Sequence, residues 1–110
     1  MTTKKSKDFL DSKASAALEH ELLGKPLTFG MAIESLRDLH ELSQIKLAKK
    51  LGISKQYLCD VEKGRKLVSP DQAVRFAKAM GHPPAFFVKL SLQDSVNQTG
   101  LKLKVTVEAA

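Results

Sequence analysis

Residues 43–64, SQIKLAKKLGISKQYLCDVEKG, constrain the fold of this chain more than any other stretch. Their pattern predicts two short helices joined by a tight turn at Gly52, because glycine tolerates the left-handed backbone that such a turn needs. Apolar residues recur at helical spacing on one face of each predicted helix, with lysines elsewhere on the surface. These faces comprise Leu47, Ala48 and Leu51 in the first helix, and Leu58 and Val61 in the second.

Each of these helices follows a serine that is suited to cap it. Ser43 precedes the first helix and Ser54 precedes the second, and a serine hydroxyl accepts one of the unpaired N–H groups at a helix start. Two helices of this length bury too little apolar surface to be stable alone. The segment upstream supplies a partner helix with the apolar residues Ile33, Leu36 and Leu39.

Two more helices are predicted after the turn. Residues 69–72, SPDQ, combine a serine cap, a proline at the first helical position and a glutamine at the capping-box position. This helix ends at Gly81, and Pro83 and Pro84 open the next one. The paired phenylalanines of the second helix are interpreted as core or dimer contacts. The apolar positions of the two helices are Val74, Phe76, Ala77, Met80, Phe86, Phe87 and Leu90.

Together these motifs resemble the Xre/Cro type of helix-turn-helix DNA-binding domain over residues 28–92. The resemblance implies an all-α, five-helix, lambda-repressor-like fold that binds double-stranded DNA. Glu41 stands where many members have glycine, so the first interhelical turn is expected to be built differently. The matching residues are Ile33, Leu36 and Arg37, LSQ at 42–44, LAKKLGIS at 47–54 and the E-x-G of 62–64.

The chain divides into three predicted parts. Residues 1–27 are an N-terminal extension, helical over 6–23 or partly disordered, that packs on the domain or contacts a partner. Residues 28–93 are the DNA-binding domain, and residues 94–110 are a tail that carries a strand. A chain of 110 residues has room for one small core.

Charge and cysteine content narrow the function. The formal net charge is +6, and its excess lies in residues 42–81, where nine Lys and Arg face three Asp and Glu. Such a basic stretch on the helix-turn-helix is typical of a nucleic-acid-binding surface, although lysines also solvate small helical domains. The single cysteine allows no internal disulfide, and with no membrane-length apolar run a cytoplasmic location is expected.

Base reading is expected from the second helix of the motif. Helix-turn-helix proteins place this helix in the major groove with its N-terminal side chains at the base edges. Lys55 suits guanine and Gln56 suits adenine. Asp60, one turn beyond Gln56, either accepts from a cytosine amino group or keeps the helix away from phosphates.

Other polar residues are expected to position the domain. Tyr57 either donates to a phosphate or packs over the turn. Arg37 matches a family residue that pairs with the acid of the E-x-G motif, so the resemblance implies a structural ion pair between Arg37 and Glu62. An unpaired charge there would cost several kcal/mol. The predicted phosphate contacts are Gln44, Tyr57, Lys63, Arg65 and Lys66.

The C-terminal residues predict one half-buried strand. Apolar and polar residues alternate strictly over residues 101–108. The chain has no second strand of this quality, so the strand is expected to pair with its symmetry mate or with another protein, or else to be a frayed tail. The apolar positions are Leu101, Leu103, Val105 and Val107.

The sequence is compatible with two kinds of repressor. A short domain with small extensions resembles the HigA-like and HipB-like antitoxins of type II toxin-antitoxin modules, which repress their own operon and bind a cognate toxin. The alternative is a stand-alone phage-type or chromosomal repressor; in both cases a homodimer on a palindromic operator is expected. An enzyme is disfavoured, and no cofactor, metal or catalytic residue is predicted, because His20, His40, His82 and Cys59 lack ligand spacing.

Overall fold

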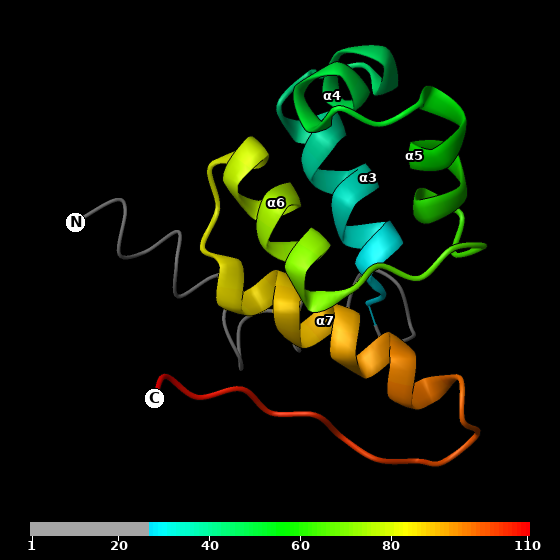
Figure 1. The fold of residues 1–110 in the computed structure, drawn as a ribbon, viewed down its shortest axis with the longest axis vertical. Helices are drawn as coiled ribbons and strands as arrows, with labels where there is room; N and C mark the ends of the chain where they lie inside the picture. The colour runs from blue at the N-terminus through cyan, green and yellow to red at the C-terminus, as the bar shows by residue number, and fades with distance from the viewer. Residues whose placement is uncertain (1–26) are drawn as a thin grey trace.

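The computed structural model describes residues 27–110, which form five helices. Figure 1 shows an extended tail after the last of them. The helices are α3 (Phe29–Leu39), α4 (Gln44–Leu51), α5 (Lys55–Glu62), α6 (Pro70–Met80) and α7 (Pro84–Asn97). Within this part of the chain no strand occurs, and no helix is long and apolar enough to cross a membrane. The predicted five-helix, all-α arrangement is therefore observed, whereas residues 1–26 of the predicted extension lie outside the described residues.

Serine and glycine set the ends of the short helices, as predicted. The hydroxyls of Ser43, Ser54 and Ser69 each accept the N–H of the third residue of the following helix, at 3.0–3.1 Å. Ser69 also forms a capping box with that third residue. Gly52 and Gly81 end α4 and α6, both with a left-handed φ of 71°. These local signals fix where the two helices of the motif begin and turn.

The turn between α3 and α4 keeps a left-handed residue although it lacks glycine. Glu41 has a φ of 54°, and it is the one non-glycine residue with positive φ among residues 27–110. The N–H of Leu42 donates to the carbonyl oxygen of Arg37 at 2.9 Å and closes the turn. The expectation of a differently built turn was therefore wrong for the backbone of this turn. Glu41 adopts the left-handed conformation that glycine favours, and its Cβ makes that conformation sterically unfavourable.

One apolar core joins the five helices. At its centre the ring of Phe29 in α3 packs edge-on against Phe76 of α6 and Phe87 of α7, with centroids 5.3 and 5.9 Å apart. Edge-to-face rings at this spacing add to the free energy of burial. The buried apolar residues are Phe29, Ala32, Ile33, Leu36, Leu47, Ala48, Leu58, Val61, Val68, Ala73, Phe76, Ala77, Met80, Phe86, Phe87 and Leu90.

Leu39 does not share the buried face of α3, which corrects the sequence prediction. Ile33 and Leu36 are 0% and 7% exposed, whereas Leu39 is 74% exposed. Because each residue turns the helix by about 100°, the stripe through these residues points next at position 40 rather than 39. Leu39 is also the last residue of α3, so no further turn of helix covers it.

A glycine allows α3 and α5 to approach closely. A Cβ at Gly30 would lie 2.7 Å from the carbonyl oxygen of Glu62 and closer still to that of Val61. Backbone atoms cannot yield in the way that a flexible side chain can. Gly30 therefore fixes the distance between α3 and the C-terminal end of α5.

The tail after α7 does not form the predicted strand. Residues 101–110 have no regular secondary structure, and Leu101, Leu103 and Val107 are 60%, 57% and 39% exposed. Val105 is half-buried. A strand needs a neighbour for its backbone groups, and residues 27–110 offer none, so the alternating pattern alone does not produce a strand.

One side chain of α7 holds the tail. Gln93 donates to the carbonyl oxygen of Leu103 at 2.8 Å and accepts from the N–H of Val105 at 2.7 Å. Figure 1 shows the tail running back along α7 toward the side from which that helix begins. The glutamine amide thus pairs with the two backbone groups that flank Lys104, as a residue of a neighbouring strand would.

Candidate nucleic-acid interface

Helix α5 presents polar side chains from its first turn and apolar ones from its other face. Lys55 and Gln56 are exposed, while Leu58, Val61 and Glu62 are buried. In Figure 1 α5 lies at the edge of the domain, with its start directed away from α7. The major groove of B-DNA is wide enough to admit such a helix. The two predicted base readers therefore lie where a nucleic acid can reach them.

A buried polar network attaches the end of α5 to α3 and α4. Arg37 donates to the Glu62 carboxylate from Nε at 2.8 Å and from Nη2 at 3.1 Å. Gln44 donates to the same carboxylate from Nε2 at 2.8 Å, and Arg37 Nη1 donates to the carbonyl oxygen of Leu42 at 3.1 Å. Three donors thus satisfy a carboxylate that is almost fully buried.

The network also has an electrostatic signature. The hydrogen bond to Glu62 raises the pKa of Arg37 above its ordinary value, although burial opposes this. A buried carboxylate without such partners would be strongly destabilising. The ion pair between Arg37 and Glu62 therefore links α3 to the last residue of α5, and Gln44 extends this link to the start of α4.

Three polar side chains are joined on the outer face of α5. Gln56 Nε2 and Arg65 Nε both donate to Asp60 Oδ1, at 3.1 and 3.0 Å. The hydrogen bond from Arg65 lowers the pKa of Asp60, and the bond from Gln56 acts in the same direction. Asp60 is therefore held as a carboxylate whose charge is partly balanced by Arg65.

These bonds separate the roles of the predicted base readers. An amide side chain has two N–H donors and one carbonyl acceptor, so Gln56 keeps one N–H and its oxygen after bonding to Asp60. These are the groups that contact adenine N7 and N6 in a bidentate pair. Asp60 is engaged by Gln56 and Arg65, whereas Lys55 forms no hydrogen bond or ion pair in the described region.

The predicted phosphate contacts fall into two groups. Gln44 uses its amide nitrogen on Glu62, and Tyr57 packs against the core with its hydroxyl 3.4 Å from Gln72 Oε1. Both are thus engaged within the domain. The other three are exposed after α5, although one of them also donates to Asp60. They are Lys63, Arg65, which forms that bond, and Lys66.

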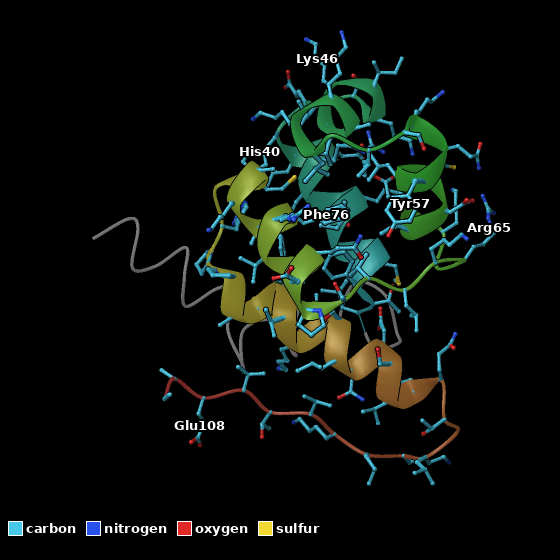
Figure 2. The ribbon with its side chains drawn as sticks, viewed as in Figure 1. His40, Lys46, Tyr57, Arg65, Phe76 and Glu108 are labelled. Atoms are coloured by element: carbon cyan, nitrogen blue, oxygen red, sulfur yellow. The ribbon has the colours of Figure 1, made fainter. Side chains whose placement is uncertain are left out.

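Further lysines lie on α4, beside α5. Lys46 and Lys49 are exposed, and Lys50, also exposed, reaches the carbonyl oxygen of Ala79 at 3.4 Å. Figure 2 shows Lys46 projecting from the domain at α4, with Arg65 on the side of α5. Cations on two neighbouring helices suit a ligand whose negative charges are spaced along its length, such as a nucleic-acid backbone.

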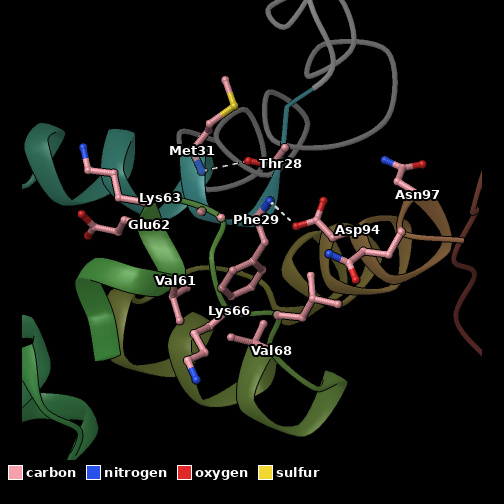
Figure 3. A pocket seen from close by; sticks show the side chains of 14 residues that line it. Thr28, Phe29, Met31, Val61, Glu62, Lys63, Lys66, Val68, Asp94 and Asn97 are labelled. Atoms are coloured by element: carbon pink, nitrogen blue, oxygen red, sulfur yellow. Dashed lines mark hydrogen bonds between the residues drawn. The ribbon is translucent and has the colours of Figure 1, made fainter. Parts of the chain in front are cut away.

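A hollow of about 590 Å³ lies between the start of α3, the loop after α5 and the end of α7. Lys63 and Lys66 are among its lining residues, as are Phe29 and Asp94 (Figure 3). No group of three or more His, Cys, Asp or Glu side chains lies close enough to hold a metal ion anywhere in residues 27–110. This finding includes the side chains that line the hollow.

Sequence reasoning missed the contact that fixes the start of α3. Asp94 Oδ2 of α7 accepts the N–H of Phe29 at 3.0 Å, alongside the bond from Met31 N–H to Thr28 Oγ1 (Figure 3). The two residues of the first bond are 65 positions apart. No local sequence pattern predicts such a cap. The one available signal is an acidic residue near the end of another helix, which can accept an unpaired N–H group at a helix start.

Comparison with protein families identifies the motif region. The model of a helix-turn-helix family, HTH_3, matches residues 33–87. Comparisons with curated proteins and with solved structures gave no significant match. The matched range runs from the buried Ile33 in α3 to the buried Phe87 in α7, and so includes the whole of α4 and α5.

Proposed function

The chain belongs to the helix-turn-helix family HTH_3, and from this premise we propose that it is a sequence-specific DNA-binding transcriptional repressor. One observation carries the proposal: α5 exposes Lys55 and Gln56 from its first turn while a buried network on Glu62 holds its other end. A helix presented in this way can enter a major groove without rearrangement.

The proposed complex divides reading from positioning. Gln56 reads adenine through its free N–H and carbonyl oxygen, and Lys55 donates to guanine. Lys63, Lys66 and the lysines of α4 contact phosphates, which orient the domain without distinguishing sequences. Asp60 and Arg65 hold Gln56 in place rather than reading a base themselves. The excess positive charge of residues 42–81 speeds association with DNA.

In this proposal, transcription is repressed because the protein binds an operator that overlaps a promoter. A homodimer presents two copies of α5, and these match a palindromic operator whose half-sites are about one helical turn apart. An operator that overlaps a promoter then excludes RNA polymerase. This step requires the dimer, for which the exposed apolar tail at Leu101 and Leu103 is the proposed contact.

The test compares Gln56→Ala with the unaltered chain on two DNAs. The operator is selected by the protein from a random library, and an unrelated duplex of the same length measures non-specific binding. Loss of a bidentate base contact is expected to weaken operator binding by about 1–3 kcal/mol and to leave non-specific binding almost unchanged. Gln98→Ala, an exposed glutamine that follows α7, is the matched control.

Two outcomes would contradict this assignment. Equal losses on both DNAs would show that Gln56 contributes no base reading. Unchanged binding to both would mean that α5 does not face the groove. Lys55→Ala and Lys78→Ala form a second matched pair, since both lysines are exposed but Lys78 lies on α6.

A narrower form of the function is that of a type II antitoxin, which represses its own operon and neutralises a toxin. The support is the tail, where Leu101, Leu103 and Val107 are exposed and one backbone edge is held by Gln93. An extended segment of this kind can add a strand to a partner's sheet. A stand-alone repressor uses the same segment for dimerisation only.

Co-purification separates these two forms. The tagged chain is expressed from its native gene neighbourhood, and the small proteins that come with it are identified by mass spectrometry. A stoichiometric partner that stops growth when expressed alone supports the antitoxin. A homodimer that retains operator binding with no partner supports the stand-alone repressor and leaves the DNA-binding proposal intact.

A further inference from the structure

Two histidines from distant parts of the chain meet at the surface. The Nε2 atoms of His40 and His82 lie 3.1 Å apart, although 42 positions separate the residues. Their rings meet edge to face with centroids 5.3 Å apart. Figure 2 shows His40 on the side of the domain away from Tyr57 and Arg65. The pair therefore lies apart from the proposed DNA-reading face.

Both histidines are held by the ends of helices. The N–H of His40 donates to the carbonyl oxygen of Leu36, which makes His40 the C-cap of α3. The N–H of His82 donates to the carbonyl oxygen of Ala77, directly after the left-handed Gly81 that ends α6. The ring of His82 is also backed by Phe87, with centroids 6.3 Å apart. Both histidine backbones are thus fixed by hydrogen bonds to the preceding helix.

We propose that His40 and His82 form a two-histidine chelate site for a divalent transition-metal ion such as Zn²⁺. A zinc ion lies about 2.0–2.1 Å from a histidine nitrogen. Two such nitrogens are about 3.0–3.4 Å apart when the angle at the metal is about 95–110°, so the observed 3.1 Å matches the bite that chelation needs. Imidazole nitrogen is a ligand that Zn²⁺, Cu²⁺ and Ni²⁺ all accept.

Binding requires a change of tautomer and a rotation of the imidazole rings that directs both Nε2 lone pairs at one point. One Nε2 carries the proton of the present hydrogen bond, and in the bound state that proton resides on Nδ1 of the same ring, which leaves both Nε2 lone pairs for the metal. His40 is exposed and His82 is half-buried, so water molecules complete the coordination shell. The metal then links the end of α3 to the turn between α6 and α7.

The first experiment follows the three histidine ring signals by proton–carbon NMR during a Zn²⁺ titration. It uses the full-length chain with Cys59→Ser, because a thiol competes for zinc. The signals of His40 and His82 are expected to shift together and to saturate at one equivalent, while that of His20 stays in place. Zn²⁺ is also expected to raise the thermal midpoint by several degrees, and EDTA to reverse the rise.

Single substitutions decide whether the pair is the site. His40→Ala and His82→Ala should each weaken zinc binding at least tenfold and remove the rise in thermal midpoint, and His20→Ala is the matched control that keeps both. Binding that His20→Ala weakens as much, or that survives His40→Ala, would overturn the proposal. A titration in which the His40 and His82 signals do not move together would do the same.

Discussion

At the scale of single residues, the domain depends on a few polar groups that are buried or strained. Glu62 accepts three hydrogen bonds in an almost dry position. Glu41 carries a side chain at a backbone angle that favours glycine. The first residue stabilises the helix arrangement and the second costs free energy, so substitutions at the two positions are expected to act in opposite directions.

Glu62→Ala is expected to lower the free energy of unfolding by about 3–5 kcal/mol, because it leaves the Arg37 guanidinium buried without its partner. Urea denaturation followed by circular dichroism measures the change. The double variant Arg37→Met, Glu62→Met should recover most of the loss, since well-packed apolar residues replace buried ion pairs at little cost. A loss below about 1 kcal/mol for Glu62→Ala would show that the network does not hold α5.

Glu41→Gly is expected to stabilise the chain. The left-handed conformation costs a residue with a Cβ about 1–2 kcal/mol, and the added freedom of glycine in the unfolded chain takes back about 0.5–1 kcal/mol. A net gain of up to about 1.5 kcal/mol should appear in the same denaturation assay. Gly52→Ala, at a φ of 71°, is the reverse substitution and should destabilise. A loss of stability in Glu41→Gly would refute the strain.

At the scale of helices, the order of α4 to α7 and the ends of α4 to α6 were predictable from sequence, because caps are local. The end of α7 at Asn97, inside the predicted tail of residues 94–110, was not. Ser54 and Gly52 act as expected in the motif. What could not be predicted is contact between distant residues, as for Asp94 at the start of α3. Leu39 was misassigned because apolar spacing alone does not show where a helix leaves the core.

The candidate site was predictable to a similar extent. The exposure of Lys55 and Gln56 follows from their place at the start of an amphipathic helix. The engagement of Asp60 by Arg65 does not follow, because Arg65 lies beyond the helix and its direction depends on the loop after α5. The capture of Gln44 by Glu62 is likewise a contact across the fold.

The contact between α7 and α3 predicts a pH dependence. Burial raises the pKa of Asp94, and the hydrogen bond from the N–H of Phe29 opposes the rise. A carboxyl with a higher pKa in the folded state binds its proton more tightly there, so its contribution to stability worsens as pH rises through the unfolded and then the folded pKa. Asp94→Asn, which keeps an acceptor, should therefore gain stability relative to the unaltered chain as pH rises from about 3.5 to 7.

Urea denaturation of both proteins across that pH range tests this expectation. The difference in free energy of unfolding should move in favour of Asp94→Asn with increasing pH. Glu108→Gln removes a carboxyl from the exposed tail and serves as the control. A difference that stays constant with pH would show that Asp94 has the same proton affinity in the folded and unfolded chain.

At the scale of the whole molecule, the tail of residues 101–110 contributes no buried residue to the core of the helical domain. Leu101 and Leu103 are more than half exposed, and the bonds from Gln93 hold only the middle of the segment. The core of α3 to α7 is built without it. The tail is therefore available for contact between chains, where its apolar side chains would lose their exposure to water.

Removal of residues 101–110 is expected to leave the helical circular dichroism unchanged but to lower the sedimentation mass from dimer to monomer and weaken operator binding. A matched pair of variants refines this result. Leu101→Ser with Leu103→Ser should reproduce the truncation, whereas Lys102→Ser with Lys104→Ser should not. An unaltered mass and operator affinity in the truncated chain would exclude the tail as the dimer contact.

The exposed first turn of α5 has a consequence for how such proteins diversify. Lys55 touches no other charged group, and Gln56 bonds only to Asp60 at the surface, while the fold depends on Leu58, Val61 and Glu62 one face away. The residues of α5 that stabilise the fold are therefore different from the residues of α5 that are proposed to set the DNA sequence preference. Under the proposed function, two copies of a duplicated gene can come to bind different operators through changes at the exposed positions, while both chains stay folded.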